Sequence, residues 1–214
     1  MSLKLTKVKN NLNEKEISSF LFTNFYSIFY LIGFKGVVPE DRECFVVFAD
    51  GKFTLIAPKL YQTEAKSLAS KELKVIISDE REFLLRDAVK IMADSKGKIS
   101  AFESEDLKYK EFEYVKAEIK TKKLLPTANV ISDLRLIKTE EEIELIRKAQ
   151  EITYKALKNL MPYVKPGVTE QELSVKLTNE FMRLGAEGES FGSIVASGKG
   201  SALPHYLTSN KKLK

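Results

Sequence analysis

The sequence has one cysteine, one histidine and no tryptophan among its 214 residues. The lone cysteine, Cys44, excludes an internal disulfide and fits a reducing compartment, and its setting in ECFVVFA predicts a small apolar core residue. His205 has neither a second histidine nor a neighbouring cysteine with which to build a zinc site of the usual nitrogen–sulfur kind. A glycine-rich phosphate loop is missing too, because GKGS at 198–201 lacks the upstream glycine and the Lys-Ser pair of a P-loop.

Long blocks of like charge are also missing, although the formal net charge is +5. The lysines are dispersed and alternate with acids, whereas a nucleic-acid footprint is usually a clustered basic face. We therefore expect a solvated, lysine-rich surface and no nucleic-acid partner. The densest acidic runs are ESED at 103–106 and TEEEIE at 139–144. We interpret the first as an exposed turn and the second as helix capping, and neither as a metal site.

One stretch has no charged residue at all, residues 17–34 (ISSFLFTNFYSIFYLIGF), and its length nearly reaches that of a transmembrane helix. Serine, threonine and asparagine residues interrupt it, and it lacks the basic start and the small-residue cleavage site of a signal peptide. We interpret it as a buried helix end, a turn and a strand. The protein is therefore predicted to be cytoplasmic, with no membrane partner.

The first half of the chain contains short apolar runs that alternate with polar helical stretches. Asp50-Gly51, between the apolar runs 45–49 and 52–57, is typical of the two-residue turn of a β-hairpin. The other predicted elements are helices over 61–70, 80–92 and 111–119, strands over 74–78 and 98–104, and extended chain around Pro126. Strands that alternate with helices of this length predict a mixed α/β layer structure.

The pattern changes at Thr139, where TEEE forms a capping box before a helix whose apolar residues recur at helical spacing. A Pro-Gly break and a second capping box, Thr169 with Glu172, begin another helix, which ends near Gly185. A strand is predicted over 191–197. We therefore expect one domain over residues 1–128 and a second over 129–214, the second with two helices, one strand and a tail.

A lone histidine is most often a surface or structural residue, so these patterns alone indicate no more than a two-domain α/β protein. However, the ordered runs LRLIKTEEEIELIRKAQEIT, VKPGVTEQEL and LGAEGESFGSIVASGKGSALPH closely resemble the aminopeptidase P, prolidase and creatinase family. Upstream, NFYSIFYLIGF, APKLYQTEA and AFESEDLKYKEF resemble the N-terminal domain of that family in the same order. The resemblance implies a creatinase-like N-terminal domain with a mixed sheet and flanking helices, followed by an incomplete pita-bread (α+β) domain.

In that family, peptidases hydrolyse the bond before proline with water activated by two divalent metal ions, which are manganese, cobalt or zinc. By resemblance, His205 matches a histidine that lies at the edge of the active site and donates a hydrogen bond to the substrate. Phe191 and Ile194 match residues near the substrate pocket. The metal ligands are expected after Lys214. Residues 1–214 alone are therefore expected to bind no metal in the manner of the family and to hydrolyse no peptide.

The resemblance thus implies the N-terminal portion of an Xaa-Pro metallopeptidase, of aminopeptidase P or prolidase type, that acts on proline-containing peptides and forms a homodimer. Apolar helix faces and a strand without cover would favour either such pairing with another chain or contact with the N-terminal domain. Two alternatives stay open at this point. One is a non-catalytic creatinase-like binding or interaction module, because a fold does not dictate a function. The other is a regulatory or oligomerisation subunit of a complete paralogue.

Overall fold

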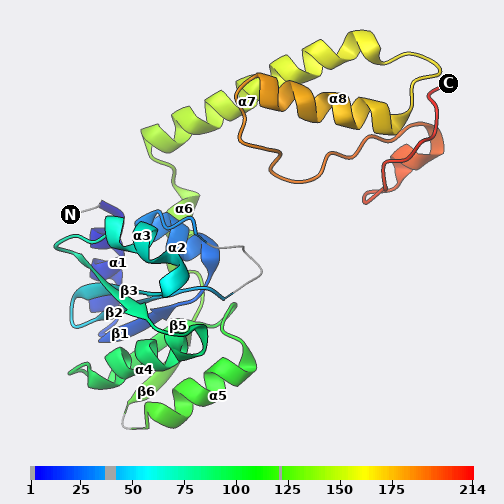
Figure 1. Ribbon diagram of the computed structural model, residues 1–214. Coiled ribbons are helices and arrows are strands. Elements are labelled where there is room, and N and C mark those ends of the chain that lie inside the picture. Colours follow the sequence, from blue (N-terminus) through cyan, green and yellow to red (C-terminus); the bar gives the residue numbers. More distant parts are fainter. Residues whose placement is uncertain (1–2, 37–41, 121) are drawn as a thin grey trace. The chain divides into compact units, whose positions relative to one another are not determined.

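The computed structural model describes residues 3–36, 42–120 and 122–214. They form two compact units, Met1–Ile137 and Lys138–Lys214, each of which is described by itself (Figure 1). The expected domain boundary at 128/129 precedes helix α6 (Val130–Leu136), whose first two residues are buried in the core of the first unit. Burial of these two side chains places α6 with the first unit, which therefore extends to Ile137.

The first unit is built on a six-stranded mixed sheet with the strand order β4-β3-β2-β1-β5-β6. The pairs β1–β2 and β2–β3 are antiparallel, whereas β3–β4, β1–β5 and β5–β6 are parallel. The strands are β1 (Ser19–Phe22), β2 (Phe45–Ala49), β3 (Lys52–Pro58), β4 (Leu73–Ser78), β5 (Ile99–Glu103) and β6 (Lys123–Thr127). The predicted extended chain around Pro126 is the edge strand β6, where a proline removes no ladder hydrogen bond that a central strand would need.

Helices cover both faces of this sheet (Figure 1). Successive strand residues point to opposite faces of the sheet. Phe20 and Phe48 pack against α1, α2, α3 and α6 on one face. Leu21 and Val47 pack against α4 and α5 on the other face. The remaining helices of this unit are α1 (Leu3–Glu14), α2 (Phe25–Ile32), α3 (Gln62–Ser67), α4 (Leu84–Asp94) and α5 (Tyr109–Glu118), with 3₁₀ turns at Lys59–Tyr61 and Arg81–Phe83. The predicted α/β fold with a mixed sheet and flanking helices is confirmed. Helix α1 is not among the elements that the sequence pattern predicted.

The predicted β-hairpin is formed by β2 and β3. Asp50 and Gly51 both have positive φ angles, 46° and 82°, and Ala49 pairs with Lys52 across the turn. Two positive φ angles in a two-residue loop match the right-handed twist of the flanking strands. The Asp-Gly signal therefore predicted this turn correctly.

The uncharged stretch 17–34 forms strand β1 and then helix α2, so the strand precedes the helix, in the reverse of the expected order. Asn24 caps α2 by accepting a hydrogen bond from the Ser27 amide, and Gly33 ends the helix with a φ of 72°. Both elements lie in the core because β1 is central in the sheet. Within the described residues, we find no helix with both the length and the apolar character needed to cross a bilayer.

Cys44 is buried, as predicted, in the core between the sheet and helices α1, α2, α3 and α6. Burial raises the pKa of its thiol to about 12, although the charge of Arg42 opposes that shift. Because the thiolate is the nucleophile, a thiol with such a pKa stays unreactive near neutral pH.

We expect the folded chain to react with a thiol reagent at pH 8 at least about a hundredfold more slowly than the chain in denaturant, because labelling must wait for the core to open. Mass spectrometry after timed quenching measures this difference. Comparable rates for the folded and denatured chains would contradict the buried position of Cys44.

The second unit consists mainly of two helices, α7 (Glu140–Leu160) and α8 (Glu170–Arg183), with 3₁₀ turns at Met161–Tyr163 and Gly198–Ala202. Both predicted capping boxes are present: the side chains of Thr139 and Thr169 each accept the amide of the glutamate three residues later. Of the apolar residues at helical spacing in α7, Ala156 and Leu160 are buried, whereas Ile146 and Leu157 are exposed.

The predicted strand over 191–197 is wrong: these residues form irregular chain. A strand needs a neighbouring strand to receive its amides, but here side chains receive them. The amide of Ser193 donates to Glu189, and the amide of Val195 donates to Thr208 Oγ1. The segment does contain the apolar pattern of a strand, but its amides donate to side chains and not to a neighbouring strand.

Candidate functional site

His205 lies in an exposed segment between the 3₁₀ turn Gly198–Ala202 and the last residues of the chain. These last residues run back along the start of α8 and bond to it through the backbone. The hydrogen bonds join Gly167 N to Leu213 O, Leu213 N to Val168 O, Glu170 N to Lys211 O, and Gln171 N to Ser209 O, at 2.8–3.0 Å. The loop that carries His205 is therefore fastened at its C-terminal end to the start of α8.

The other two predicted site residues are also exposed, Phe191 by 77% and Ile194 by 49%. Phe191 lines a cavity of about 590 Å³ formed by α7, the end of α8 and residues 186–193. Ile194 and His205 are not part of that lining. The structure thus leaves all three side chains accessible but does not gather them around one cavity.

The backbone segments that carry these residues are nevertheless held together. Thr208 Oγ1, three residues after His205, accepts the amide of Val195 at 2.9 Å. A second connection runs through Glu170, the first residue of α8, whose side chain is fully buried. Its carboxylate accepts hydrogen bonds from Ser197 and from Tyr206, which directly follows His205.

Glu170 is a residue whose role the sequence did not reveal. In the sequence it is one of the acids that commonly occupy the first turn of a helix, and the capping-box pattern identifies only Glu172, leaving Glu170 without a predicted role. Burial opposes ionisation of Glu170, but hydrogen bonds from Ser197, Tyr206 and Ser209 outweigh it and lower its pKa to about 2. The group is therefore a carboxylate throughout the physiological pH range.

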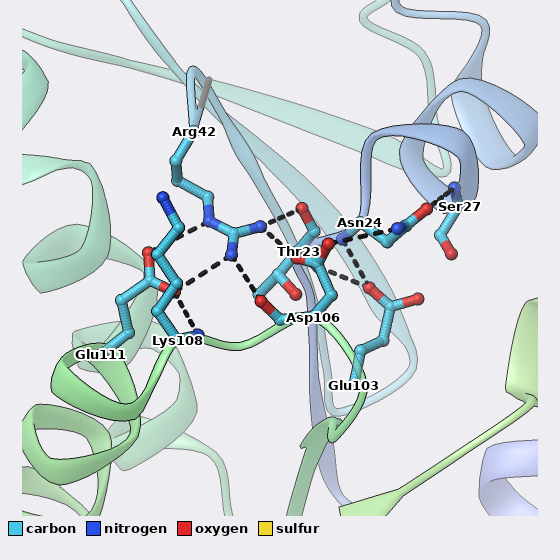
Figure 2. Close-up of polar contacts among 8 residues, drawn as sticks. All are labelled: Thr23, Asn24, Ser27, Arg42, Glu103, Asp106, Lys108 and Glu111. Atoms are coloured by element: carbon cyan, nitrogen blue, oxygen red, sulfur yellow. Dashed lines mark hydrogen bonds and ion pairs between the residues drawn. The ribbon is translucent and has the colours of Figure 1, made fainter. Parts of the chain in front are cut away.

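A second polar cluster lies in the first unit, around Arg42 (Figure 2). The Arg42 guanidinium donates to Glu111 through Nε at 3.0 Å and Nη2 at 3.1 Å, and it forms an ion pair with Asp106. It also donates to the backbone carbonyls of Thr23 and Asp106. Only 15% of the Arg42 side chain is exposed. Arg42 therefore joins the end of β1, the loop after β5 and the start of α5.

Glu103 extends this cluster to the start of α2. Its Oε2 accepts the amides of Thr23 and Asn24, both at 2.7 Å, and Asn24 donates to Asp106 at 3.1 Å (Figure 2). The predicted exposed turn is present over residues 104–106, where Ser104 and Glu105 are exposed, but Glu103 ends β5 and only Ser104 and Glu105 face solvent freely. Glu103 and Asp106 are partly buried because they satisfy backbone amides and Arg42.

The pKa values of Glu103 and Asp106 are shifted in opposite directions. Burial raises the pKa of Glu103 above its ordinary value, and the hydrogen bonds from Asn24, Ser27 and Thr23 only partly offset it. Burial acts the same way on Asp106, but there the hydrogen bonds from Arg42, Thr23 and Asn24 prevail and lower the pKa. The difference follows from the position of Arg42, which pairs with Asp106 and not with Glu103.

A cavity of about 240 Å³ adjoins this cluster at the carboxyl ends of the parallel strands β1, β5 and β6, and Asn24, Glu103 and Arg135 are among its lining residues. Among the residues that the structure describes, no three histidine, cysteine, aspartate or glutamate side chains are placed to hold a metal ion. The described residues therefore do not fit a divalent metal centre, and the acids of the Arg42 cluster bind protein groups.

Two family models together match almost the whole chain. The creatinase/prolidase N-terminal domain matches residues 4–137, and metallopeptidase family M24 matches residues 144–214. These ranges agree with the two compact units.

Individual relatives show the same similarity. An Xaa-Pro dipeptidase of Pyrococcus furiosus is 30% identical over 215 residues, which cover 100% of this chain and 58% of the relative. An Xaa-Pro dipeptidase from Bacillus anthracis has a similar structure, with a TM-score of 0.86 and 27% identity over 99% of this chain and 57% of the other. The X-Pro aminopeptidase from Thermotoga maritima has a TM-score of 0.80 and 27% identity, over 98% and 57%. The chain thus spans less than two thirds of the length of these relatives.

Proposed function

Since this chain belongs to the family of the creatinase/prolidase N-terminal domain and continues into a metallopeptidase domain, we propose that it is the N-terminal portion of a metal-dependent Xaa-Pro peptidase. The reaction is hydrolysis of the peptide bond before proline, and the substrate is a proline-containing peptide. One observation carries this proposal: both family models match in order, each over one compact unit of the chain.

Within this proposal, His205 donates a hydrogen bond to the bound substrate, and Phe191 and Ile194 lie near the substrate pocket. Their exposure supports these roles, because a group that contacts substrate must be accessible. The fastened loop supports them further, because a donor contributes most when its position is held before the substrate arrives.

The metal ions of the proposed enzyme are two divalent ions, manganese, cobalt or zinc. No described residue of this chain is assigned to them, because the described residues contain no fitting set of ligands. Residues 1–214 alone are accordingly expected to hydrolyse no Xaa-Pro peptide, which an assay of the purified chain with manganese would test.

The proposal is tested with the complete natural polypeptide that contains residues 1–214. We expect it to hydrolyse an Xaa-Pro dipeptide but not the matched Xaa-Ala dipeptide, to lose activity with a chelator and to regain it with manganese. Light scattering on the same sample is expected to give a dimer. Absence of hydrolysis by the metal-loaded polypeptide would overturn the proposal and favour a non-catalytic binding module.

In that polypeptide, His205→Ala should lower kcat/KM about tenfold, which is the effect of losing one hydrogen bond to substrate. Lys199→Ala is the matched control, because Lys199 is exposed in the same tail, and it should leave kcat/KM unchanged. An unaltered kcat/KM in the His205 variant would remove His205 from the site.

A further inference from the structure

We propose that Glu170 is a positioning residue: its buried carboxylate clamps the segment that ends at Ser197 and the loop that carries His205 to the first turn of α8. We call Glu170, Ser197, Tyr206 and Ser209 the Glu170 clamp. The importance of the clamp for catalysis rests on the proposed function, whereas the clamp itself is a statement about this chain alone.

The contacts of the carboxylate use both of its oxygens. Oε1 accepts the amide and the hydroxyl of Ser197 at 2.8 and 2.7 Å, and Oε2 accepts the hydroxyls of Tyr206 and Ser209 at 2.8 and 2.9 Å. Lys211 Nζ lies 3.9 Å from Oε1. Four donors from two separate segments converge on one group, and a carboxylate is the side chain that can accept all four.

The ring of Tyr206 is also restrained on a second side. Gly200 is buried, and a Cβ atom added to it would lie 2.8 Å from Cε2 of Tyr206, so the ring packs directly on the Gly200 backbone. The amide of Leu203 donates to Gly200 O at 3.0 Å, which closes the turn before His205. His205 therefore lies between a closed turn and a side chain whose ring and hydroxyl are both held.

The clamp also joins the two segments that carry the predicted substrate-contacting residues, namely residues 191–197 and the loop with His205. Ser197 ends the irregular stretch with Phe191 and Ile194, and Tyr206 follows His205 directly. If the carboxylate were lost, both segments would lose their anchor to α8, while the bond from Val195 to Thr208 and the backbone bonds of residues 209–213 would remain. Loss of the clamp should thus loosen the loop without unfolding the helices.

The direct test uses nitrogen-15 relaxation of the 214-residue chain, read at the backbone amide of His205, the only histidine. In the unaltered chain we expect an order parameter near that of rigid backbone, about 0.85, and in Glu170→Gln a value below about 0.6. A glutamine has one acceptor oxygen and no charge, and although its amide can donate to the Tyr206 and Ser209 hydroxyls, the charge-assisted bonds to both segments are lost. An order parameter that stays high in Glu170→Gln would overturn the clamp.

Two further variants separate the clamp from general damage to the end of the helix. Glu172→Gln makes the same change of charge in the first turn of the same helix, where it alters the capping box but no clamp contact, and it should leave the His205 amide rigid. Tyr206→Phe keeps the ring on Gly200 and removes one hydroxyl, so it should loosen His205 less than Glu170→Gln and remain measurable if that variant fails to fold. Equal loosening by Glu172→Gln would contradict the clamp.

The catalytic part is tested by a double-mutant cycle in the complete polypeptide. If Glu170 acts through His205, Glu170→Gln should lower kcat/KM about tenfold alone but have no further effect in the His205→Ala background. Additive losses would show that Glu170 does not act through His205. Failure of the proposed function would remove this cycle but not the relaxation result, so the two failures are distinguishable.

Discussion

Replacing Arg42 by methionine is expected to lower the free energy of unfolding of the first unit by about 3 kcal/mol. Methionine fills similar space but leaves the half-buried carboxylates of Asp106 and Glu111 without their cation. The carbonyl of Thr23 loses a donor as well. Removing one partner of a buried ion pair costs more than the pair contributes, because the remaining charge stays desolvated.

Urea unfolding measures this loss, with the labelling of Cys44 as a probe that reports on the first unit alone. Arg86→Met is the matched control: Arg86 pairs with Asp87 but is 54% exposed, so its loss should cost about 0.5 kcal/mol. Equal losses for the two arginine variants would show that the Arg42 cluster behaves as a surface pair.

The difference between Arg42→Met and the unaltered chain should also depend on pH. Asp106 has a lowered pKa in the folded chain, so its contribution to stability is present above the unfolded value of about 3.9 and is lost as the pH falls through the folded value. Arg42→Met removes the hydrogen bond and the charge of Arg42, which lower the pKa of Asp106. The two unfolding free energies should therefore converge below about pH 4, and a gap independent of pH would contradict the ion pair with Asp106.

Replacing Phe48 by alanine is expected to cost about 3–5 kcal/mol of the same unfolding free energy. Phe48 is 1% exposed on the central strand β2, where it pairs with Phe20 on one side and Phe53 on the other. The rings of Phe48 and Phe53 have centroids 5.2 Å apart. Truncation would leave a cavity between the sheet and the helices of that face, which rigid strands cannot collapse to fill.

A loss of this size is a large fraction of the stability of an ordinary domain, so the variant should unfold at much lower urea concentration. Leu60→Ala is the control, because Leu60 is 77% exposed in the same unit, and it should change the unfolding free energy by less than about 0.5 kcal/mol. A small effect of Phe48→Ala would mean that the aromatic row across β1, β2 and β3 is not the centre of the core.

Features that depend on neighbours in the chain could be predicted from the amino-acid sequence alone. Asp50-Gly51 provides the two positive φ angles of its own turn, and the boxes that begin at Thr139 and Thr169 close within three residues. The apolar run around Cys44 similarly predicted its burial. In each case the residues that stabilise the feature lie inside the pattern that predicts it.

Other features needed partners that no local pattern identifies. Arg42 reaches Asp106 across 64 positions of the chain, and Tyr206 reaches Glu170 across 36. The acids involved look like any exposed or capping acid in a single sequence, because a side chain acquires its burial and pKa only from what surrounds it. Both polar clusters were therefore unpredictable, and the turn predicted at residues 103–106 gave no sign that Glu103 and Asp106 are partly buried.

The segment 191–197 shows the same division within one stretch. In this segment apolar and small residues alternate along the sequence, a pattern that is typical of a strand. Whether such a segment becomes a strand depends on an adjacent strand to accept its amides, and here Glu189, Thr208 and Glu170 accept them instead. Turns and caps gain their free energy within one turn of the chain, whereas pairing, burial and the anchoring of the His205 loop arise only when distant residues meet.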